Sequence, residues 1–224
     1  MAEVAWNHAG LMDATYRSQR YVYDFSRKYY LLGRDALIED LGAAPGDSVV
    51  EIGCGTARNL IKMALIYPDT AFYGLDASEE MLKTARRSIA RAGLSDRIRL
   101  VRGYAENLSP EMFGRKTPFT HVVFSYSLSM IPDWKQALRK ASDAAGAGKI
   151  HVVDFGNMDG VWPPLARLLG LWLRLFHVTP RTEILKRLES SHAMEEQTTR
   201  LRILPAHYAF IWQGSSKAVQ NLAL

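Results

Sequence analysis

The segment Val49–Leu60, VVEIGCGTARNL, constrains the fold of this chain more than any other. A short apolar run ends in Glu51 and Ile52 and passes into a turn that contains Gly53 and Gly55. Glycine accepts positive φ angles and leaves room for a ligand to approach the backbone. The helical pattern that follows would direct its unpaired N–H groups and the positive end of its dipole toward that ligand. The segment therefore predicts a β-strand, a ligand-binding turn and a helix.

Apolar runs alternate with helical patterns along the middle of the chain. The expected strands are 49–52, 71–75, 97–101, 119–125 and 149–155, and the expected helices are 57–66, 79–92 and one that begins near residue 133. Ser78 is the expected N-cap of the second helix. This alternation predicts a parallel α/β sheet with helices on both faces. Arg200–Leu204 and Tyr208–Trp212 predict a final antiparallel hairpin.

A second acidic residue, Asp76, ends the run AFYGLD, 25 residues after Glu51. An acid at the end of a second parallel strand can accept hydrogen bonds from both ribose hydroxyls of an adenosine ligand. A nicotinamide-binding domain would usually show G-x-G-x-x-G, but Arg58 occupies the place of the last glycine. E-x-G-x-G followed by Asp at this spacing resembles the S-adenosylmethionine site of class I methyltransferases, with Ala57 at the family's usual third glycine. The resemblance covers residues 45–155 and implies the Rossmann-like fold of that class.

The resemblance also implies the remaining cofactor contacts. Asp76 is followed by Met81, whose side chain could cover one face of adenine. Gly103–Leu108 resembles the family's G-D-A-x-x-L segment, with Tyr104 in place of its aspartate. Either Glu106 substitutes for that aspartate, or backbone and water hold the adenine amino group. The expected cofactor-binding residues are Tyr21, Glu51, Gly53, Cys54, Gly55, Asp76, Ala77, Met81, Tyr104, Ala105, Glu106 and Ser125.

The N-terminal segment 12–40 has a helical pattern that is rich in tyrosine and arginine. Tyrosines recur every seven residues, each four residues before an arginine, so both rows would share a face of a continuous helix. One interpretation is an amphipathic helix that packs on the domain. The other is a lid that brings hydroxyls and guanidinium groups to an anionic, aminated substrate. The expected catalytic residues are Tyr16, Tyr23, Tyr30 and Tyr126, and the expected substrate-binding residues are Arg17, Arg20, Arg34 and Arg181.

The segment TYRSQRYVYDFSRKYYLLGRD resembles bacterial lipid-headgroup N-methyltransferases, above all those of betaine-lipid synthesis, and so does Phe176–Arg181. The resemblance implies three successive methyl transfers to the amine of diacylglyceryl-homoserine. Alternatives are an N-methyltransferase for phosphatidylethanolamine or a small-molecule amine, and a cofactor-binding pseudoenzyme that serves as a subunit. Tyrosine faces suit a methylammonium product, and a paired arginine suits a carboxylate.

The 224 residues predict one domain, with a lid at 1–44, a cofactor-binding core at 45–155, and a substrate or membrane helix with C-terminal strands at 156–224. The single cysteine excludes a disulfide within one chain, and no spacing of metal ligands stands out. Ser125–Leu128 is not the Asn/Asp-Pro-Pro-aromatic segment of nucleic-acid amino-methyltransferases, so no nucleic-acid partner is expected. His121 and His151 lie in apolar strands and are expected to be core histidines.

The formal charge of +5 favours an anionic partner. Pro164–His177 is mostly apolar, with Arg167 and Arg174 on one face. This segment predicts docking on an anionic membrane, although a helix buried against the sheet is the alternative. Because the N-terminus lacks the features of a signal peptide, we expect a cytoplasmic protein in peripheral contact with the inner face of the membrane.

Overall fold

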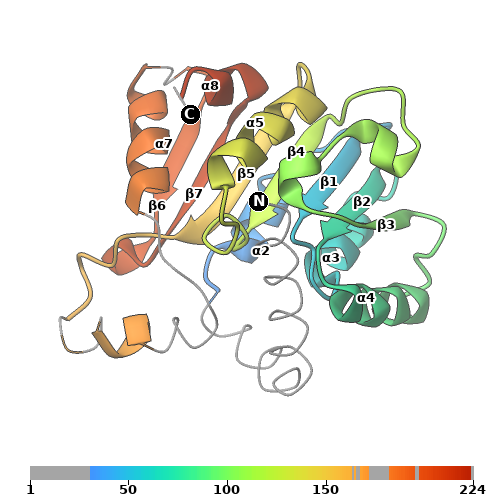
Figure 1. The fold of residues 1–224 in the computed structure, drawn as a ribbon, viewed down its shortest axis with the longest axis horizontal. Helices are drawn as coiled ribbons and strands as arrows, with labels where there is room; N and C mark the ends of the chain where they lie inside the picture. Colours follow the sequence, from blue (N-terminus) through green and yellow to red (C-terminus); the bar gives the residue numbers. More distant parts are fainter. Residues whose placement is uncertain (1–30, 163, 165–166, 172–181, 195–196, 223–224) are drawn as a thin grey trace.

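The computed structural model describes residues 31–162, 164, 167–171, 182–194 and 197–222 (Figure 1). Seven strands form one sheet in the order β3-β2-β1-β4-β5-β7-β6. The strands are β1 Ser48–Ile52, β2 Ala71–Asp76, β3 Ile98–Arg102, β4 His121–Ser125, β5 Lys149–Phe155, β6 Arg200–Ile203 and β7 Ala209–Ser215. The first five are parallel to one another, whereas β7 runs antiparallel to both β5 and β6. The predicted Rossmann-like sheet with a final hairpin is confirmed.

Helices cover both faces of the sheet, as a parallel sheet requires. They are α2 Arg34–Glu39, α3 Arg58–Ile66, α4 Glu79–Arg91, α5 Trp134–Ala145, α7 Thr182–Met194 and α8 Ser216–Gln220. Apolar side chains of α2, α3 and α4 belong to one buried cluster, and those of α5, α7 and α8 belong to a second. The central strand β1 is buried along its whole length. The core therefore consists of two layers that the sheet separates.

The expected helix over 12–40 is interrupted where the structure describes it. Gly33 has φ 83° and stands before α2, which begins only at Arg34. A Cβ at residue 33 would lie 2.8 Å from Cδ1 of Leu204. Helical geometry therefore does not continue from Leu32 into α2, and the idea that Arg34 shares one helical face with earlier arginines is wrong. The rest of the predicted lid lies outside the described residues.

The chain order of the sheet reverses beside β1, which has β2 on one side and β4 on the other. Ligands of open α/β sheets bind beyond the carboxyl ends of the strands at such a switch point. The segments that leave β1, β2, β3 and β4 at this edge are 53–57, 77–78, 103–104 and 126–133. We call this side of the sheet the carboxyl edge.

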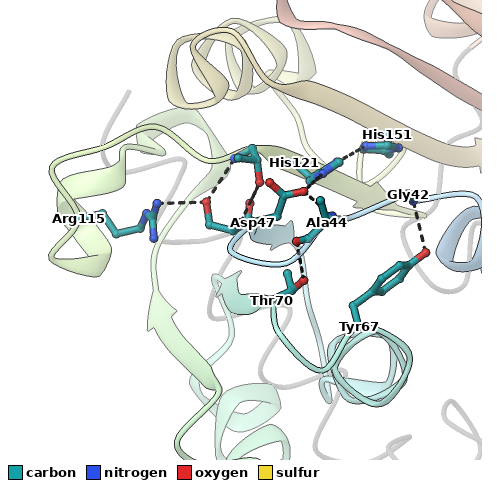
Figure 2. Close-up of polar contacts among 10 residues, drawn as sticks. Gly42, Ala44, Asp47, Tyr67, Thr70, Arg115, His121 and His151 are labelled. Atoms are coloured by element: carbon teal, nitrogen blue, oxygen red, sulfur yellow. Dashed lines mark hydrogen bonds and ion pairs between the residues drawn. The ribbon is translucent and has the colours of Figure 1, made fainter.

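A separate polar cluster lies at the opposite, amino edge of the sheet (Figure 2). His121 Nε2 lies 3.1 Å from Asp47 Oδ2, and His121 Nδ1 lies 2.9 Å from His151 Nε2. The Asp47 carboxylate also accepts a hydrogen bond from the backbone N–H of Ala44. Both histidines are buried, as predicted. This cluster ties β4 and β5 to the chain that enters β1.

Candidate cofactor site

The glycine turn after β1 folds back over the end of β2. The backbone N–H groups of Gly53 and Cys54 both donate to the carbonyl oxygen of Leu75, at 2.8 and 3.1 Å. Gly53 has φ 72°, and a Cβ there would lie 2.7 Å from Cβ of Ser127. Glycine is therefore required at residue 53 both by its backbone angle and by the close approach of the chain that follows β4.

Ala57 explains how the chain dispenses with a third glycine. It is the residue before α3 and adopts a left-handed conformation, with φ 64° and ψ 21°. Such a conformation costs an alanine roughly 1–2 kcal/mol relative to the right-handed region. Its methyl group is completely buried in the core, which offsets part of that cost. Arg58 does not crowd the sheet, because its side chain points outward and pairs with Asp35 at 2.9 Å.

Asp76 stands at the last position of β2 and is almost fully buried. One carboxylate oxygen accepts the backbone N–H of Gly55 at 2.7 Å, and the other accepts that of Ser78 at 2.9 Å. The carboxylate therefore links the glycine turn to the start of α4. A carboxylate has about four acceptor positions, so these two bonds use only part of them.

Glu51 is buried in β1 and accepts a hydrogen bond from the Asn59 side-chain amide at 2.7 Å. Asn59 lies in the first turn of α3, so this bond fixes the helix on the strand that precedes the turn. Glu51 thus supports the turn by holding the helix after it against the strand before it. Asn59 was not predicted, although its place eight residues after an acidic strand residue is the signal that could have indicated it.

Cys54 contributes to the turn through its backbone, whereas its side chain packs inward. The thiol is buried, and its sulfur would lie 2.8 Å from a Cβ on Gly74 of β2. Burial raises the pKa of the Cys54 thiol well above its usual value, and the charges of Asp76 and Glu51 add to the effect. A direct contact between this thiol and a cofactor does not fit that geometry.

The residues predicted to contact adenine lie in the segments that follow β2 and β3, and they differ in burial. Ala77 is half-buried, and Met81 is buried on the first turn of α4, where its N–H donates to the Ser78 hydroxyl. Tyr104 and Glu106 are half-buried on either side of the buried Ala105. These residues form a turn and a short 3-10 helix directly after β3. Both alternatives for the adenine amino group therefore remain compatible with the structure.

Two serines at the end of β4 carry buried hydroxyls. Oγ of Ser125 and Oγ of Ser127 have no hydrogen-bond partner among the residues that the structure describes. The side chain of Ser127 lies directly against Gly53. Polar groups that are buried at a strand end and lack a protein partner are suited to contact a bound polar ligand. Sequence reasoning named Ser125 and overlooked Ser127, whose signal was its position in the same Ser-Tyr-Ser segment.

Tyr126, between these serines, is not placed as predicted. It has φ 57°, its ring packs edge-on against Phe155, and its hydroxyl donates to the carbonyl oxygen of Leu32 at 2.5 Å. The hydroxyl thus holds the chain just before α2. A direct catalytic contact, which would require that hydroxyl at the reacting atoms, does not fit this geometry.

The predicted residues of the lid fall into two groups. Arg34 is buried at the start of α2 and is therefore placed as part of the packed domain. The others lie outside the described residues, so their predicted roles stay predictions: Tyr16, Arg17, Arg20, Tyr21, Tyr23 and Tyr30. The same holds for Arg181, which was predicted to bind substrate from outside the lid.

The sheet order has the Rossmann-like arrangement of the class I methyltransferase fold, and the acid at the end of β2 and the glycine turn lie where that fold binds its cofactor. The acid at the end of β2, the glycine turn and the buried serine hydroxyls fit a ligand that has a ribose and a charged amino-acid part. Residues 49–148 match the family described as "Methyltransferase domain". The cofactor of this domain is S-adenosylmethionine.

Two relatives with similar sequences are demethylmenaquinone methyltransferases. The chain is 28% identical over 143 residues to a demethylmenaquinone methyltransferase of Geobacillus stearothermophilus, which covers 63% of this chain and 58% of that protein. It is 32% identical over 117 residues to a demethylmenaquinone methyltransferase of Listeria monocytogenes, which covers 51% of this chain and 47% of the relative. The chain therefore spans only about half the length of these relatives.

Solved structures agree on the fold. The S-adenosylmethionine-dependent methyltransferase SibL in its apo form superposes with a TM-score of 0.66 at 23% identity, over 88% of this chain and 58% of SibL. The mitomycin 7-O-methyltransferase MmcR superposes with a TM-score of 0.63 at 17% identity, over 90% of this chain and 59% of MmcR. Identities this low establish the shared architecture alone.

Proposed function

We propose that this protein transfers methyl groups from S-adenosylmethionine to the amine of a lipid headgroup. The observation that carries the transfer itself is the position of Asp76. Its carboxylate links the glycine turn after β1 to the start of α4 at the switch point of the sheet. A ribose held there leaves the rest of the cofactor to extend toward the end of β4.

The groups at the ends of β4 and β5 support an amine as the acceptor. Among the described residues they are the Ser125 and Ser127 hydroxyls and the Asp154 carboxylate. Asp154 is buried, and its two oxygens accept the backbone N–H groups of Ser129 and Phe155. It therefore holds the loop after β4 and is poorly placed to remove a proton from a substrate.

Methyl transfer to an amine needs little acid–base assistance. An amine with a pKa of about 8 is roughly one-tenth neutral at pH 7, so deprotonation adds only about 1.4 kcal/mol to the barrier. Positioning of the two reactants can supply about 7–11 kcal/mol. A site that orients an amine beside the cofactor, without a strong base, therefore suffices.

The choice of a lipid headgroup rests on the resemblance of residues 15–35 and 176–181 to the betaine-lipid N-methyltransferases. The specific form of the proposal is successive methylation of diacylglyceryl-homoserine to its trimethylated betaine lipid. Phosphatidylethanolamine and small-molecule amines are alternatives within the same chemistry. The predicted tyrosines and arginines of the lid would bind the ammonium and the carboxylate of such a headgroup.

A second candidate is methylation of a demethylmenaquinone, because the similar characterised proteins bear that name. The two candidates differ in the acceptor atom, which is a nitrogen in one and a ring carbon in the other. An amine accepts up to three methyl groups, whereas the quinone ring would accept one. The number of methyl groups transferred therefore separates them.

The test is incubation of the purified protein with radiolabelled S-adenosylmethionine and, in separate micelles, diacylglyceryl-homoserine, phosphatidylethanolamine or demethylmenaquinone. Mass spectrometry of the extracted lipids counts the methyl groups added. We expect mono-, di- and trimethylated homoserine lipid. Methylation of the quinone alone would contradict the amine proposal. Cofactor binding without transfer to any acceptor would favour the pseudoenzyme subunit.

A further inference from the structure

We infer that the segment after β5 forms a membrane-docking surface that turns the carboxyl edge of the sheet toward an anionic bilayer. This inference rests on the proposed lipid substrate and specifies how the protein reaches it. The docking surface consists of Trp162, Leu168 and Leu171, which are exposed to 72%, 63% and 61%. Within the described part of the chain, no helix is long and apolar enough to cross a membrane. The proposed contact is therefore peripheral.

The docking surface belongs to a segment that is fixed to the domain. The backbone N–H groups of Gly156, Met158 and Gly160 donate to the carbonyl oxygens of Tyr208, His207 and Ala206, at 2.9, 2.9 and 3.3 Å. These two segments of the chain approach each other closely. A Cβ on Gly156 would lie 2.1 Å from the His207 carbonyl oxygen, and one on Gly160 would lie 2.7 Å from Cα of Ala206. These contacts fix the start of the segment against the turn before β7.

The same segment has an inner face that packs on the domain. Val161 and Leu169 contact the buried cluster that also includes Met158 and Phe155. Residues 167–171 are helical, so Leu168 and Leu171, three residues apart, share a face that differs from that of Leu169. Large apolar side chains therefore lie on the outward face as well as on the inward one. In Figure 1 this short orange helix stands clear of the sheet, at the lower left.

Exposed apolar residues are distributed unequally between the two edges of the sheet. Besides the docking surface, the carboxyl edge has Leu32, which is 44% exposed and whose carbonyl oxygen accepts the Tyr126 hydroxyl. The remaining large exposed apolar residues that the structure describes are Leu65 and Ile66, at the far end of α3. The cofactor site and most of this exposed apolar surface therefore lie on the same side of the molecule. A lipid headgroup would approach the cofactor from that side.

The charges near the docking surface favour an anionic bilayer only weakly. Arg167 is exposed beside Leu168, whereas Asp159 is exposed where the segment begins. The whole chain has a formal charge of +5. Insertion of the tryptophan and the two leucines is therefore the larger contribution, with attraction of the basic protein to anionic lipid as the smaller one. High salt should weaken the docking and leave most of it in place.

The single cysteine of the chain makes a direct test possible. Because Cys54 is buried and its pKa is raised, it should resist labelling. A nitrobenzoxadiazole dye attached to Leu168→Cys would report insertion by brighter, blue-shifted emission. The matched control is Leu65→Cys, since Leu65 is exposed to 67% and lies at the far end of α3. The probe is vesicles of equimolar phosphatidylcholine and phosphatidylglycerol, without acceptor lipid.

We expect the emission to shift at residue 168 and to stay unchanged at residue 65. In co-sedimentation with the same vesicles, Trp162→Glu should lower the affinity about tenfold or more, as expected when a large apolar side chain leaves the membrane. No shift at residue 168, equal shifts at both residues, or a shift already present without vesicles would overturn the inference. The last outcome would mean that another segment or a second copy covers the surface. Since no methyl transfer is measured, failure here is distinct from failure of the proposed function.

Discussion

At Gly53, the backbone conformation, the packing against the chain after β4 and the expected approach of a ligand all favour glycine. Its φ of 72° disfavours any other residue, and its closest neighbour is Ser127 at the end of β4. We predict that Gly53→Ala destabilises the fold by more than the roughly 1–2 kcal/mol of a left-handed alanine, because the new methyl group also displaces Ser127. Cofactor affinity should fall as well. Chemical denaturation and calorimetry measure the two effects.

Gly93 offers a matched control, because its φ of 70° is nearly the same and a Cβ there would meet nothing within 4 Å. Gly93→Ala should therefore show the backbone cost alone, with unchanged cofactor affinity. Equal losses of stability in the two variants, with equal affinity for the cofactor, would show that the contact between Gly53 and Ser127 has no consequence for the site.

At the scale of elements, the chain of Asp47, His121 and His151 couples β4 and β5 to the entry of β1. The carboxylate can only accept, so Nε2 of His121 carries a hydrogen and its Nδ1 accepts from Nε2 of His151. Nδ1 of His151 is then left buried, with no partner among the described residues. Protonation would place an N–H there without an acceptor. The arrangement therefore requires both imidazoles to be neutral.

Acid should consequently weaken these links between strands. Burial lowers the pKa of both histidines below the usual 6.5, and nearby Lys149 lowers them further, whereas Asp47 partly opposes the shift at His121. The unfolded chain thus binds protons first, and stability is lost as the pH falls below about 6.5. Asp154 acts in the opposite direction, because burial raises its pKa from 3.8 to about 6. Its contribution grows as the pH falls between those values.

The comparison of wild type with His151→Gln isolates the histidine effect, since Asp154 is common to both proteins. We predict that the stability advantage of the wild type shrinks between pH 7 and pH 5 in denaturant titrations. The same titrations on His207→Gln, at an exposed position, control for the loss of an imidazole. A His151→Gln difference that stays constant over this range would show that His151 does not titrate differently in the folded chain.

The sequence predicted the elements whose periodicity is strong. The five parallel strands, the N-cap at Ser78 and the final hairpin follow from short apolar runs and nearby turn residues. The helix α7 was not predicted, since its apolar residues Ile184, Leu185 and Leu188 pack on the same layer as α5 without a strong repeat. The break at Gly33 was missed because the tyrosine and arginine spacing seemed continuous across it.

The sequence indicates where the expected site residues stand along the chain, but not where their side chains point. Asp76 and the glycines follow from a spacing that the strand ends impose. The inward thiol of Cys54 and the Tyr126 hydroxyl on Leu32 depend on residues far away in the sequence. No local pattern encodes such contacts. The same holds for the close contact between Ser127 and Gly53, although the position of Ser127 in the Ser-Tyr-Ser segment could have indicated the residue itself.

At the scale of the whole molecule, the two edges of the sheet carry different groups of residues. The amino edge is closed by the buried histidine cluster, whereas the carboxyl edge carries the Asp76 site, the Leu32 contact and the exposed segment after β5. Cofactor, acceptor and membrane would therefore meet on one side. All of this depends on binding of S-adenosylmethionine at the end of β2.

The most direct test is calorimetric titration of S-adenosylmethionine into wild type, Asp76→Asn and Asp96→Asn. Asp96 is an exposed acid at the amino edge, so it controls for loss of charge. The loss of hydrogen bonds to a buried carboxylate predicts that Asp76→Asn weakens binding by roughly 1.5–3 kcal/mol, about 10- to 150-fold. Asp96→Asn should bind like the wild type. Unchanged affinity in a folded Asp76→Asn variant would contradict the assignment of the cofactor site.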